Sequence, residues 1–351
     1  MNKSVDEYIR LHQAEDATER NKEYKTLVNS YYDLATLFYE WGWGKSFHFA
    51  SRYAYETFDE SIRRHEHYLA SKLGVSGEAA KMKLLDVGCG IGGPMRNICR
   101  FTGADVTGIT LNQYQVQRGN ELCQIEFGKG GKVAGDALPC RSVQGDFMEM
   151  PFKDDTFDGA YAIEATCHAP DRVGVYSEIL RVLKPGSIFA CYEWCMTDSY
   201  EPKNVEHNRI KKQIEEGGGL PDICPTSVCL EAMRKAGFEI LDERDLADDD
   251  TTIGTIMGVS KGKPWYLPLT SSWNPLTQRF QFNWFGMFLT KYMLKVLEFM
   301  FLAPGGTSKT QMMLQRAAIG LADGGKAKIF TPMYLMVGRV PMVKKADAGE
   351  Q

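Results

Sequence analysis

A glycine-rich turn at residues 84–94 constrains the fold of this chain more than any other segment. It reads LLDVGCGIGGP: an apolar run, four glycines and a proline. The apolar run is typical of a buried strand, and proline is well tolerated in the first turn of a helix. Glycines let a ligand approach the backbone, and a helix N-terminus presents unpaired amides to an anionic group. The segment therefore predicts a strand, a ligand-binding turn and a helix in succession.

The rhythm around this turn predicts an α/β fold. Short β-rich runs alternate with helical stretches, a pattern that builds a doubly wound, mostly parallel sheet. Strands are expected at 83–87, 104–109, near 142, 156–163 and 187–194, and helices from about 93, 113 and 172. We expect three regions: an N-terminal helical segment (1–75), a ligand-binding core (76–246) and a mixed C-terminal region (247–351).

Composition excludes several classes of protein. A net charge of −4 over 351 residues gives no electrostatic case for nucleic-acid binding. Nine scattered cysteines indicate a reducing compartment and neither a disulfide framework nor a zinc site. We expect no signal peptide, no transmembrane helix and no metal. The apolar stretch 284–304 is interrupted by Lys291, Lys295 and Glu298, which predicts an amphipathic helix that suits a membrane surface. Four histidines without metal-ligand spacing are expected at the surface: His12, His65, His67 and His207.

Two cofactors use a glycine turn of this kind. Gly88, Gly90 and Gly93 satisfy the G-x-G-x-x-G pattern of dinucleotide-binding proteins. That site also needs an acid at the end of the second strand, whereas this strand ends GITLN at 108–112. Asp86 lies two residues before the first glycine, where it can reach the cationic methionine end of S-adenosylmethionine. We therefore predict S-adenosylmethionine as the ligand.

Further motifs follow in the order that an S-adenosylmethionine site requires. Asp146, at the end of the third strand, can accept a hydrogen bond from the adenine amine beside the ring of Phe147. Segments 151–158 and 180–186 then lead into the fourth and fifth strands. Together these motifs resemble those of the class I methyltransferases, which implies a seven-stranded sheet. The predicted donor-binding residues are Asp86, Gly88, Cys89, Gly90, Gly92, Thr110, Asn112, Gln115, Asp146, Phe147 and Glu164.

Three segments rich in aromatic and acidic residues indicate the methyl acceptor. Residues 39–49 (YEWGWGKSFHF) hold five aromatic side chains and follow no helical or strand period. Residues 161–170 (YAIEATCHAP) and 192–198 (YEWCMTD) follow the fourth and fifth strands, at the edge where doubly wound folds place their sites. These segments closely resemble those of the sterol 24-C-methyltransferases, the plant and algal members in particular. Further similar segments lie at 215–222, 264–269, 302–306 and 329–334, so the resemblance extends from about residue 31 to 339.

The resemblance implies a substrate and a reaction. A methyl group passes to carbon 24 of a cycloartenol- or zymosterol-like side chain, and the resulting carbocation loses a proton to give a 24-methylene sterol. Aromatic faces stabilise such a cation in a dry site, by about 0.5–2 kcal/mol for each contact. The rings expected around it are Tyr39, Trp41, Trp43, Phe47, Tyr161 and Trp194.

The final proton needs an acceptor, and five residues are candidates. A buried carboxylate with a raised pKa, or a neutral histidine, would serve. The candidates are Glu40, Glu164, His168, Glu193 and Asp198. Glu164 and His168 are favoured because they flank one turn at the end of the fourth strand. The resemblance also implies a homo-oligomer, and the insoluble substrate indicates peripheral association with the cytoplasmic face of the endoplasmic reticulum or another endomembrane.

Two other interpretations stay open. One is methylation of a tocopherol-like ring or a small amine, against which the 39–49 segment argues. The other is a sterol-binding module without catalysis, against which the glycine turn with Asp86 and Asp146 argues.

Residues 110–115 depart from the family, which usually has a run of asparagines there, and resemble the cyclopropane-forming lipid methyltransferases instead.

Overall fold

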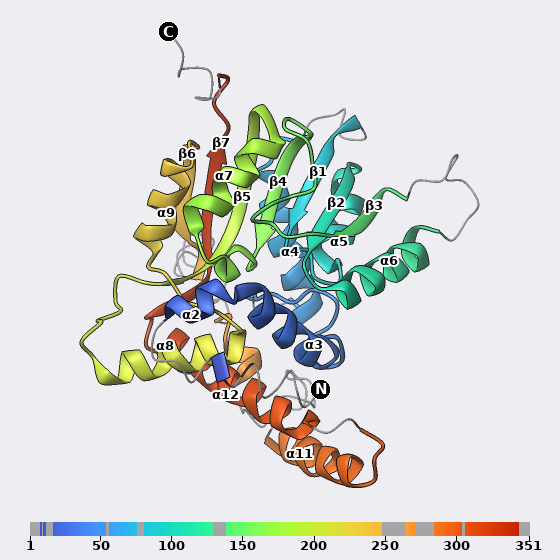
Figure 1. The fold of residues 1–351 in the computed structure, drawn as a ribbon, viewed down its shortest axis with the longest axis vertical. Coiled ribbons are helices and arrows are strands. Elements are labelled where there is room, and N and C mark those ends of the chain that lie inside the picture. Colours follow the sequence, from blue (N-terminus) through green and yellow to red (C-terminus); the bar gives the residue numbers. More distant parts are fainter. Residues whose placement is uncertain are drawn as a thin grey trace.

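A sheet of seven strands organises the chain (Figure 1). The strand order is β3-β2-β1-β4-β5-β7-β6; β1 to β5 are parallel, and β7 is antiparallel to both of its neighbours. The strands are β1 (Lys83–Val87), β2 (Asp105–Thr110), β3 (Cys140–Gln144), β4 (Phe157–Ile163), β5 (Leu183–Met196), β6 (Glu239–Asp245) and β7 (Phe330–Arg339). The predicted doubly wound, mostly parallel sheet is confirmed. This computed structural model describes residues 8, 10–11, 17–53, 56–75, 81–128, 138–247, 264–270, 284–303 and 306–343.

Helices cover both faces of the sheet. On one face are α4 (Phe58–Ser71), α5 (Gly93–Thr102) and α6 (Gln113–Phe127), and on the other are α7 (Arg172–Val182) and α9 (Thr226–Lys235). Leu69 and Ile98 are fully buried on the first face, and Ile179 and Met233 are fully buried on the second. Burial on both faces explains why the parallel strands are apolar along most of their length.

The helices that begin at the carboxyl edge of the sheet have clear start signals. Pro94 lies in the first turn of α5, as predicted. The Asn112 side chain caps α6 by accepting a hydrogen bond from the Gln115 backbone N–H at 3.1 Å. These caps fix the turns after β1 and β2, where the predicted donor-binding residues lie.

A further layer of helices lies beyond the carboxyl ends of the parallel strands (Figure 1). It contains α2 (Ala17–Lys22), α3 (Tyr24–Gly42), α8 (Val205–Gly218), α11 (Trp284–Phe299) and α12 (Thr307–Lys326), with short 3-10 turns at η2 (Thr166–His168) and η3 (Leu267–Leu269). Gly217 of α8 packs directly on α12, since a Cβ there would lie 2.1 Å from the Cβ of Ala317. Helix α12 also contacts α3, so helices from the N-terminal and C-terminal parts of the chain pack together beyond this edge of the sheet.

The sheet crosses the boundary expected at residue 246. Strand β7 comes from the predicted C-terminal region, yet it pairs with β5 and β6 inside the sheet. All of its residues except Arg339 are buried. Likewise α4, from the predicted N-terminal segment, contributes Leu69 to the core of the sheet. The outer regions are therefore continuous with the core.

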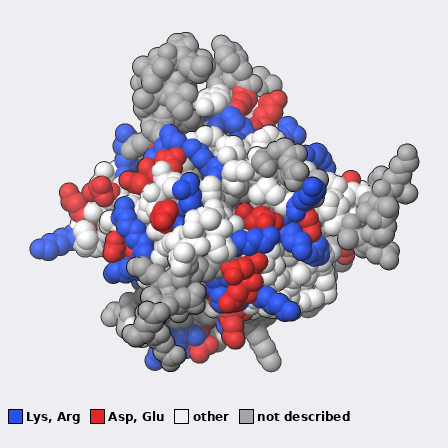
Figure 2. Space-filling view, turned by 90° about the horizontal axis from the view of Figure 1, so that it is seen from above, with Lys and Arg blue, Asp and Glu red and all other residues white. Residues whose placement is uncertain are grey.

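The surface carries charges of both signs. On the part of the face in Figure 2 that the structure describes, basic and acidic side chains are interspersed, as the small net charge leads one to expect. Among the described residues, no helix has the length and apolar character to cross a membrane, and no cluster of side chains could hold a metal ion. The composition of residues 128–136, rich in glycine and charged side chains, predicts a surface loop. Apart from Gly128 this segment lies outside the described residues, as do His12, Pro304 and Gly305.

Candidate active site

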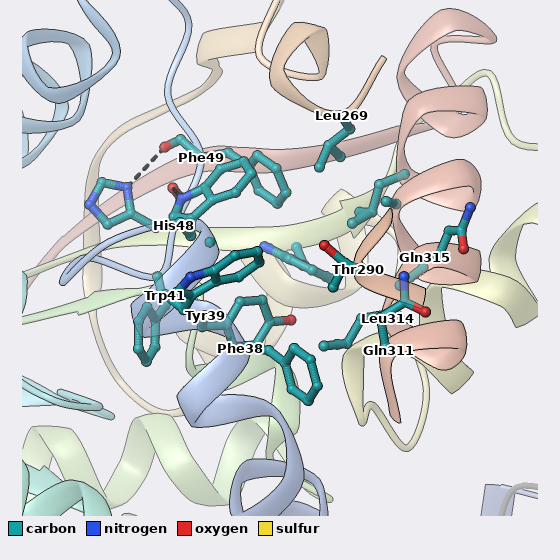
Figure 3. Close-up of a pocket in the computed structure, with 17 residues that line it drawn as sticks. Phe38, Tyr39, Trp41, His48, Phe49, Leu269, Thr290, Gln311, Leu314 and Gln315 are labelled. Carbon is teal, nitrogen blue, oxygen red and sulfur yellow. Dashed lines mark hydrogen bonds between the residues drawn. The ribbon is translucent and has the colours of Figure 1, made fainter. Parts of the chain in front are cut away.

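Two cavities adjoin at the carboxyl edge of the sheet. The first, the glycine-turn cavity, lies against Gly88, Gly90 and Phe147 and encloses about 710 Å³ of empty space, its opening to solvent included. The second, the aromatic cavity, lies between α3, β5, α11 and α12 (Figure 3) and encloses about 1010 Å³ on the same measure. Phe47 and His48 line both cavities. The two cavities therefore share part of their lining, and we call this shared pair of residues the wall.

The glycine turn has the shape that its sequence predicts. Gly88, Gly90 and Gly92 have φ values of +81°, +53° and +73°, which L side chains rarely adopt. A Cβ on Gly88 would lie 2.3 Å from the Cβ of Ala165, and one on Gly93 would lie 2.1 Å from the carbonyl oxygen of Lys45. The turn therefore packs against the end of β4 on one side and against the aromatic segment on the other.

The aromatic segment 39–49 is partly helical. Its first four residues form the last turn of α3, so the expectation that it lacks a helical period was wrong for this part. The helix ends where the Gly44 N–H donates to the Tyr39 carbonyl at 3.0 Å, with Gly44 at φ +122°. The chain then turns back across the glycine turn, where the Phe47 ring lies 3.8 Å from the position of a Cβ on Gly90. Glycines next to the tryptophans hide the helical period in the sequence.

Most of the predicted rings surround the aromatic cavity, whose lining includes Tyr39, Trp41, Trp43, Phe47 and Trp194. Ring centroids are 5.3 Å apart for Tyr39 and Phe47, and 5.0 Å apart for Trp43 and Phe49. The ring of Trp194 lies 6.0 Å from that of Phe49. The indole N–H of Trp43 donates to the His48 carbonyl at 2.9 Å, which fixes this ring against the wall. Adjacent ring contacts therefore hold the cavity in shape.

Two of the predicted rings have different positions. Tyr161 is fully buried beneath the glycine turn, where its hydroxyl donates to Asp86 at 3.1 Å, so its assignment to the ring cage was wrong. Alternation along β4 turns its side chain toward α4 and α5. Trp41 lines the aromatic cavity, but 54% of its surface is exposed, which places it at the edge.

Glu164 lies at the junction of the cavities. Its carboxylate accepts hydrogen bonds from the Phe49 backbone N–H and the Trp194 indole N–H, each at 2.7 Å. Burial raises the pKa of Glu164 to about 8. Its φ of +53° is strained for a residue with a side chain, which is common at functional sites. A buried carboxyl group is thus held between the glycine turn and the rings.

A buried pair that the sequence did not reveal supports the wall. Nδ1 of His48 donates to the Phe49 carbonyl at 2.9 Å, and Nε2 lies 3.0 Å from Oε1 of Glu66. The same carboxylate accepts from Ser46 and Asn97, each at 2.7 Å. Burial opposes the charge on His48, but Glu66 outweighs it and raises the pKa of this histidine. A single acid on an amphipathic helix gives no sequence signal for such a role.

His168 lines the glycine-turn cavity as a neutral ring. Its Nδ1 donates to the Gly219 carbonyl at 3.1 Å, so its Nε2 accepts from the Tyr32 hydroxyl at 3.0 Å. Burial lowers the pKa of His168 to about 4. The one acceptor nitrogen of this ring is taken by Tyr32, whereas each carboxylate oxygen of Glu164 keeps a second lone pair, which favours Glu164 over His168 as the proton acceptor.

The other candidate acids lie away from the cavities. Glu193 is fully buried and accepts from the hydroxyls of Thr166 and Tyr176. Asp198 is exposed, and Glu40 pairs with Arg118, whose Nε lies 3.0 Å from Oε1. None of the three lines either cavity, so their assignment to catalysis stays a prediction that the geometry does not favour.

Helix α3 covers one side of the glycine-turn cavity, and its residues Val28 and Tyr32 belong to the lining. Asn112 donates to Asp33 of α3 at 2.7 Å, and Asp146 forms an ion pair with Lys25 at 2.8 Å and accepts from the Tyr24 hydroxyl. The predicted donor-binding residues that line the cavity are Gly88, Cys89, Gly90, Thr110, Asn112, Gln115, Phe147 and Glu164. Asp86, Gly92 and Asp146 do not line it; Asp86 is buried behind the turn, and burial raises its pKa to about 7.

One of the histidines expected at the surface is buried. His65 is 3% exposed and stacks on Tyr192 of β5 at 3.8 Å, because this side of α4 packs on the sheet. His67 and His207 are partly buried, and His67 stacks on Phe101 at 4.1 Å. The surface prediction was therefore wrong for His65.

The strand order of the sheet and the glycine turn after β1 together define the class of protein. A glycine turn after β1, in a sheet whose only antiparallel strand among those described is β7, is the arrangement of the class I methyltransferases. The cyclopropane synthase MmaA2 of Mycobacterium tuberculosis superposes with a TM-score of 0.62 over 90% of this chain and 97% of that one, at 15% identity. Residues 85–191 match the family described as methyltransferase domain.

The sequence relatives identify the family. Residues 277–342 match the family described as sterol methyltransferase C-terminal. The chain is 51% identical to cycloartenol-C-24-methyltransferase 1 of Oryza sativa, over 97% of this chain and 92% of that protein. It is 45% identical to a sterol 24-C-methyltransferase of Saccharomyces cerevisiae, over 93% of this chain and 82% of that protein. The chain belongs to the sterol 24-C-methyltransferase family, as its motifs predict.

The raised pKa of Glu164 predicts a pH dependence of stability. The folded chain keeps a proton, up to pH about 8, that the unfolded chain loses near its ordinary pKa of 4.5. The stability of the wild type relative to Glu164→Gln should therefore fall as pH rises from 5 to 8, by up to ~1.4 kcal/mol per pH unit, and then level off. Urea unfolding of both proteins at pH 5–9 measures this difference.

The control is the exposed acid Glu206, whose pKa lies below 4.5. Glu206→Gln should differ from the wild type by the same amount throughout pH 5–9. A flat difference for Glu164→Gln as well would contradict the raised pKa.

Proposed function

We propose that this protein transfers a methyl group from S-adenosylmethionine to carbon 24 of a cycloartenol- or zymosterol-like side chain. The observation that carries the proposal is that the aromatic cavity and the glycine-turn cavity adjoin, since Phe47 and His48 line both. A methyl donor in one cavity and an alkene in the other would meet there. Such alignment of reactants can supply a large part of a rate enhancement.

The glycine-turn cavity fits the donor. Gly88 and Gly90 leave the backbone open to a close ligand, and α5 begins directly after the turn. Phe147 offers an apolar face for an adenine ring, and Thr110 and Asn112 add polar groups at the end of β2. Asp146 binds adenine in this proposal only if the ligand takes the place of its partners on α3.

The aromatic cavity fits a sterol. Its lining consists mainly of aromatic and aliphatic side chains, with a few polar groups among them, as in most sites for apolar small molecules. Its polar groups near the wall are turned toward protein partners, so the rings present apolar faces. Such a lining stabilises a tertiary cation and supplies no nucleophile to capture it.

The reaction in this site begins with the sterol alkene. Its electron pair forms a bond from carbon 24 to the donor methyl group as the carbon–sulfur bond breaks, and positive charge appears on carbon 25. A hydride shifts from carbon 24 to carbon 25. A proton then leaves the added methyl group, which gives the 24-methylene product. We assign this proton to the ionised carboxylate of Glu164, which lies at the junction. With its pKa at about 8, this carboxylate is present in only part of the molecules at neutral pH and is a stronger base than an ordinary glutamate.

The direct test is an assay with labelled S-adenosylmethionine and a sterol panel. We expect label in the 24-methylene product of cycloartenol or zymosterol, and none in a tocopherol precursor or a small amine. Product analysis by mass spectrometry distinguishes the outcomes. Sterol binding without transfer would indicate a binding module, and label in the amine or the tocopherol precursor would contradict the proposal.

Replacement of the two tryptophans should separate catalysis from donor binding. Trp43 is 7% exposed and Trp41 is 54% exposed, so Trp43→Leu should lower turnover more, by about tenfold, through the lost cation–π contact. The dissociation constant for S-adenosylmethionine should stay within about twofold of the wild type in both variants. Steady-state kinetics and calorimetry measure the two quantities. Equal losses in both would indicate misfolding and contradict the assignment of the ring.

We further propose that α11 rests on a membrane, which gives the insoluble sterol a path to the cavity. One side of this helix exposes apolar residues, and it ends at Phe299, which is 84% exposed. Its other side supplies Thr290 to the lining of the aromatic cavity. Glu298 is hydrogen-bonded to Ser308 at 2.6 Å, and Lys295 is exposed to solvent. This arrangement suits a helix that lies in the interface, on the cytoplasmic face of an endomembrane.

A flotation assay with vesicles of phosphatidylcholine and phosphatidylserine tests this surface. Phe299→Ser should lower the fraction bound about tenfold, because burial of a phenylalanine contributes ~1.5–3 kcal/mol. Phe101→Ser is the matched control, since Phe101 is 52% exposed on α5, at the side of the sheet. Equal binding of both variants would contradict the assignment to α11. The homo-oligomer implied by the family resemblance stays a prediction.

A further inference from the structure

Gln311 lines the aromatic cavity, and its side-chain oxygen lacks a hydrogen-bond partner among the described residues. Near the wall, the polar groups of the lining have partners: the Trp43 indole, the Trp194 indole and both nitrogens of His48. Oε1 of Gln311 is buried without a hydrogen-bond partner among the described residues. An unpaired buried acceptor is rare in folded proteins and is costly unless a ligand pairs with it.

Gln311 lies at the end of the cavity that is remote from the wall. It belongs to α12, is 8% exposed and lines the cavity. Figure 3 shows Gln311 and His48 on opposite sides of the cavity, with Thr290 of α11 on the side of Gln311. The cavity thus has a ring-lined end next to the glycine turn and a polar group at its far end.

We infer that the side-chain amide of Gln311 binds the 3-hydroxyl of the sterol. The inference rests on the proposed function, because the ligand is taken to be a sterol with its side chain at the wall. The hydroxyl is the sole polar group of such a molecule and lies at the opposite end from the alkene. A hydroxyl donates one hydrogen bond and accepts others, and an amide offers both an acceptor and a donor. This hydrogen bond between Gln311 and the 3-hydroxyl sets how far the side chain of the sterol extends toward the methyl donor.

The test compares a 3-hydroxysterol with the same sterol lacking this hydroxyl. The ratio of their kcat/KM values measures recognition of the group. We expect the wild type to favour the hydroxysterol by about tenfold or more. Gln311→Met, which keeps the chain length, and Gln311→Leu should each bring the ratio close to one. Most of this change should appear as a higher KM for the hydroxysterol.

Gln213→Met is the matched control. Gln213 belongs to α8, which packs on α12, and accepts from Arg209 at 2.8 Å outside the cavity. This variant should keep the wild-type ratio. Undiminished discrimination in both Gln311 variants, with S-adenosylmethionine affinity and melting temperature unchanged, would overturn the inference. Failure of the wild type to methylate any sterol would instead overturn the proposed function.

Discussion

The contact between Gly93 and the backbone of Lys45 is the constraint on which the site depends. A Cβ at residue 93 would lie 2.1 Å from the Lys45 carbonyl oxygen and 2.5 Å from Oγ of Ser46. Glycine therefore permits the aromatic segment to cross the turn at the start of α5. The crossing places Phe47 and His48 between the two cavities and gives the Phe49 backbone N–H to Glu164. A bulkier residue would push the rings away from the glycine turn, and the cavities would separate.

Buried acids give this wall its electrostatic character. Glu66 stabilises a proton on His48, and Glu164 lies on the other side of Phe49. In a site of low dielectric constant, a fixed carboxylate or a ring face acts on a developing cation more strongly than it would in water. The strain of Glu164, at φ +53°, fits a side chain that is held for function at the cost of local stability. Catalysis in this account comes from a preformed environment around the alkene.

The sequence predicted the fold and much of the site because the relevant signals are local. The strand–turn–helix segment at 84–94 and the alternation after it fix the sheet and the position of the donor. Other features depend on distant parts of the chain. The place of β7 between β5 and β6 follows from pairing between residues far apart in sequence. The burial of Tyr161 under Asp86 depends on which face of β4 meets α4, and the partnership of Glu66 with His48 depends on the packing of two separate segments. Gln311 gave no signal, since its meaning lies in the cavity around it.

A crystal structure with S-adenosylhomocysteine and the substrate sterol is the most direct measurement of the central claim. The account predicts the sulfur in the glycine-turn cavity and the sterol side chain in the aromatic cavity. Phe47 should touch both ligands, and carbon 24 should lie where a methyl group on the sulfur would be within ~3–3.5 Å. A sterol bound outside the ring-lined cavity, or bound with its side chain remote from the sulfur, would contradict the account.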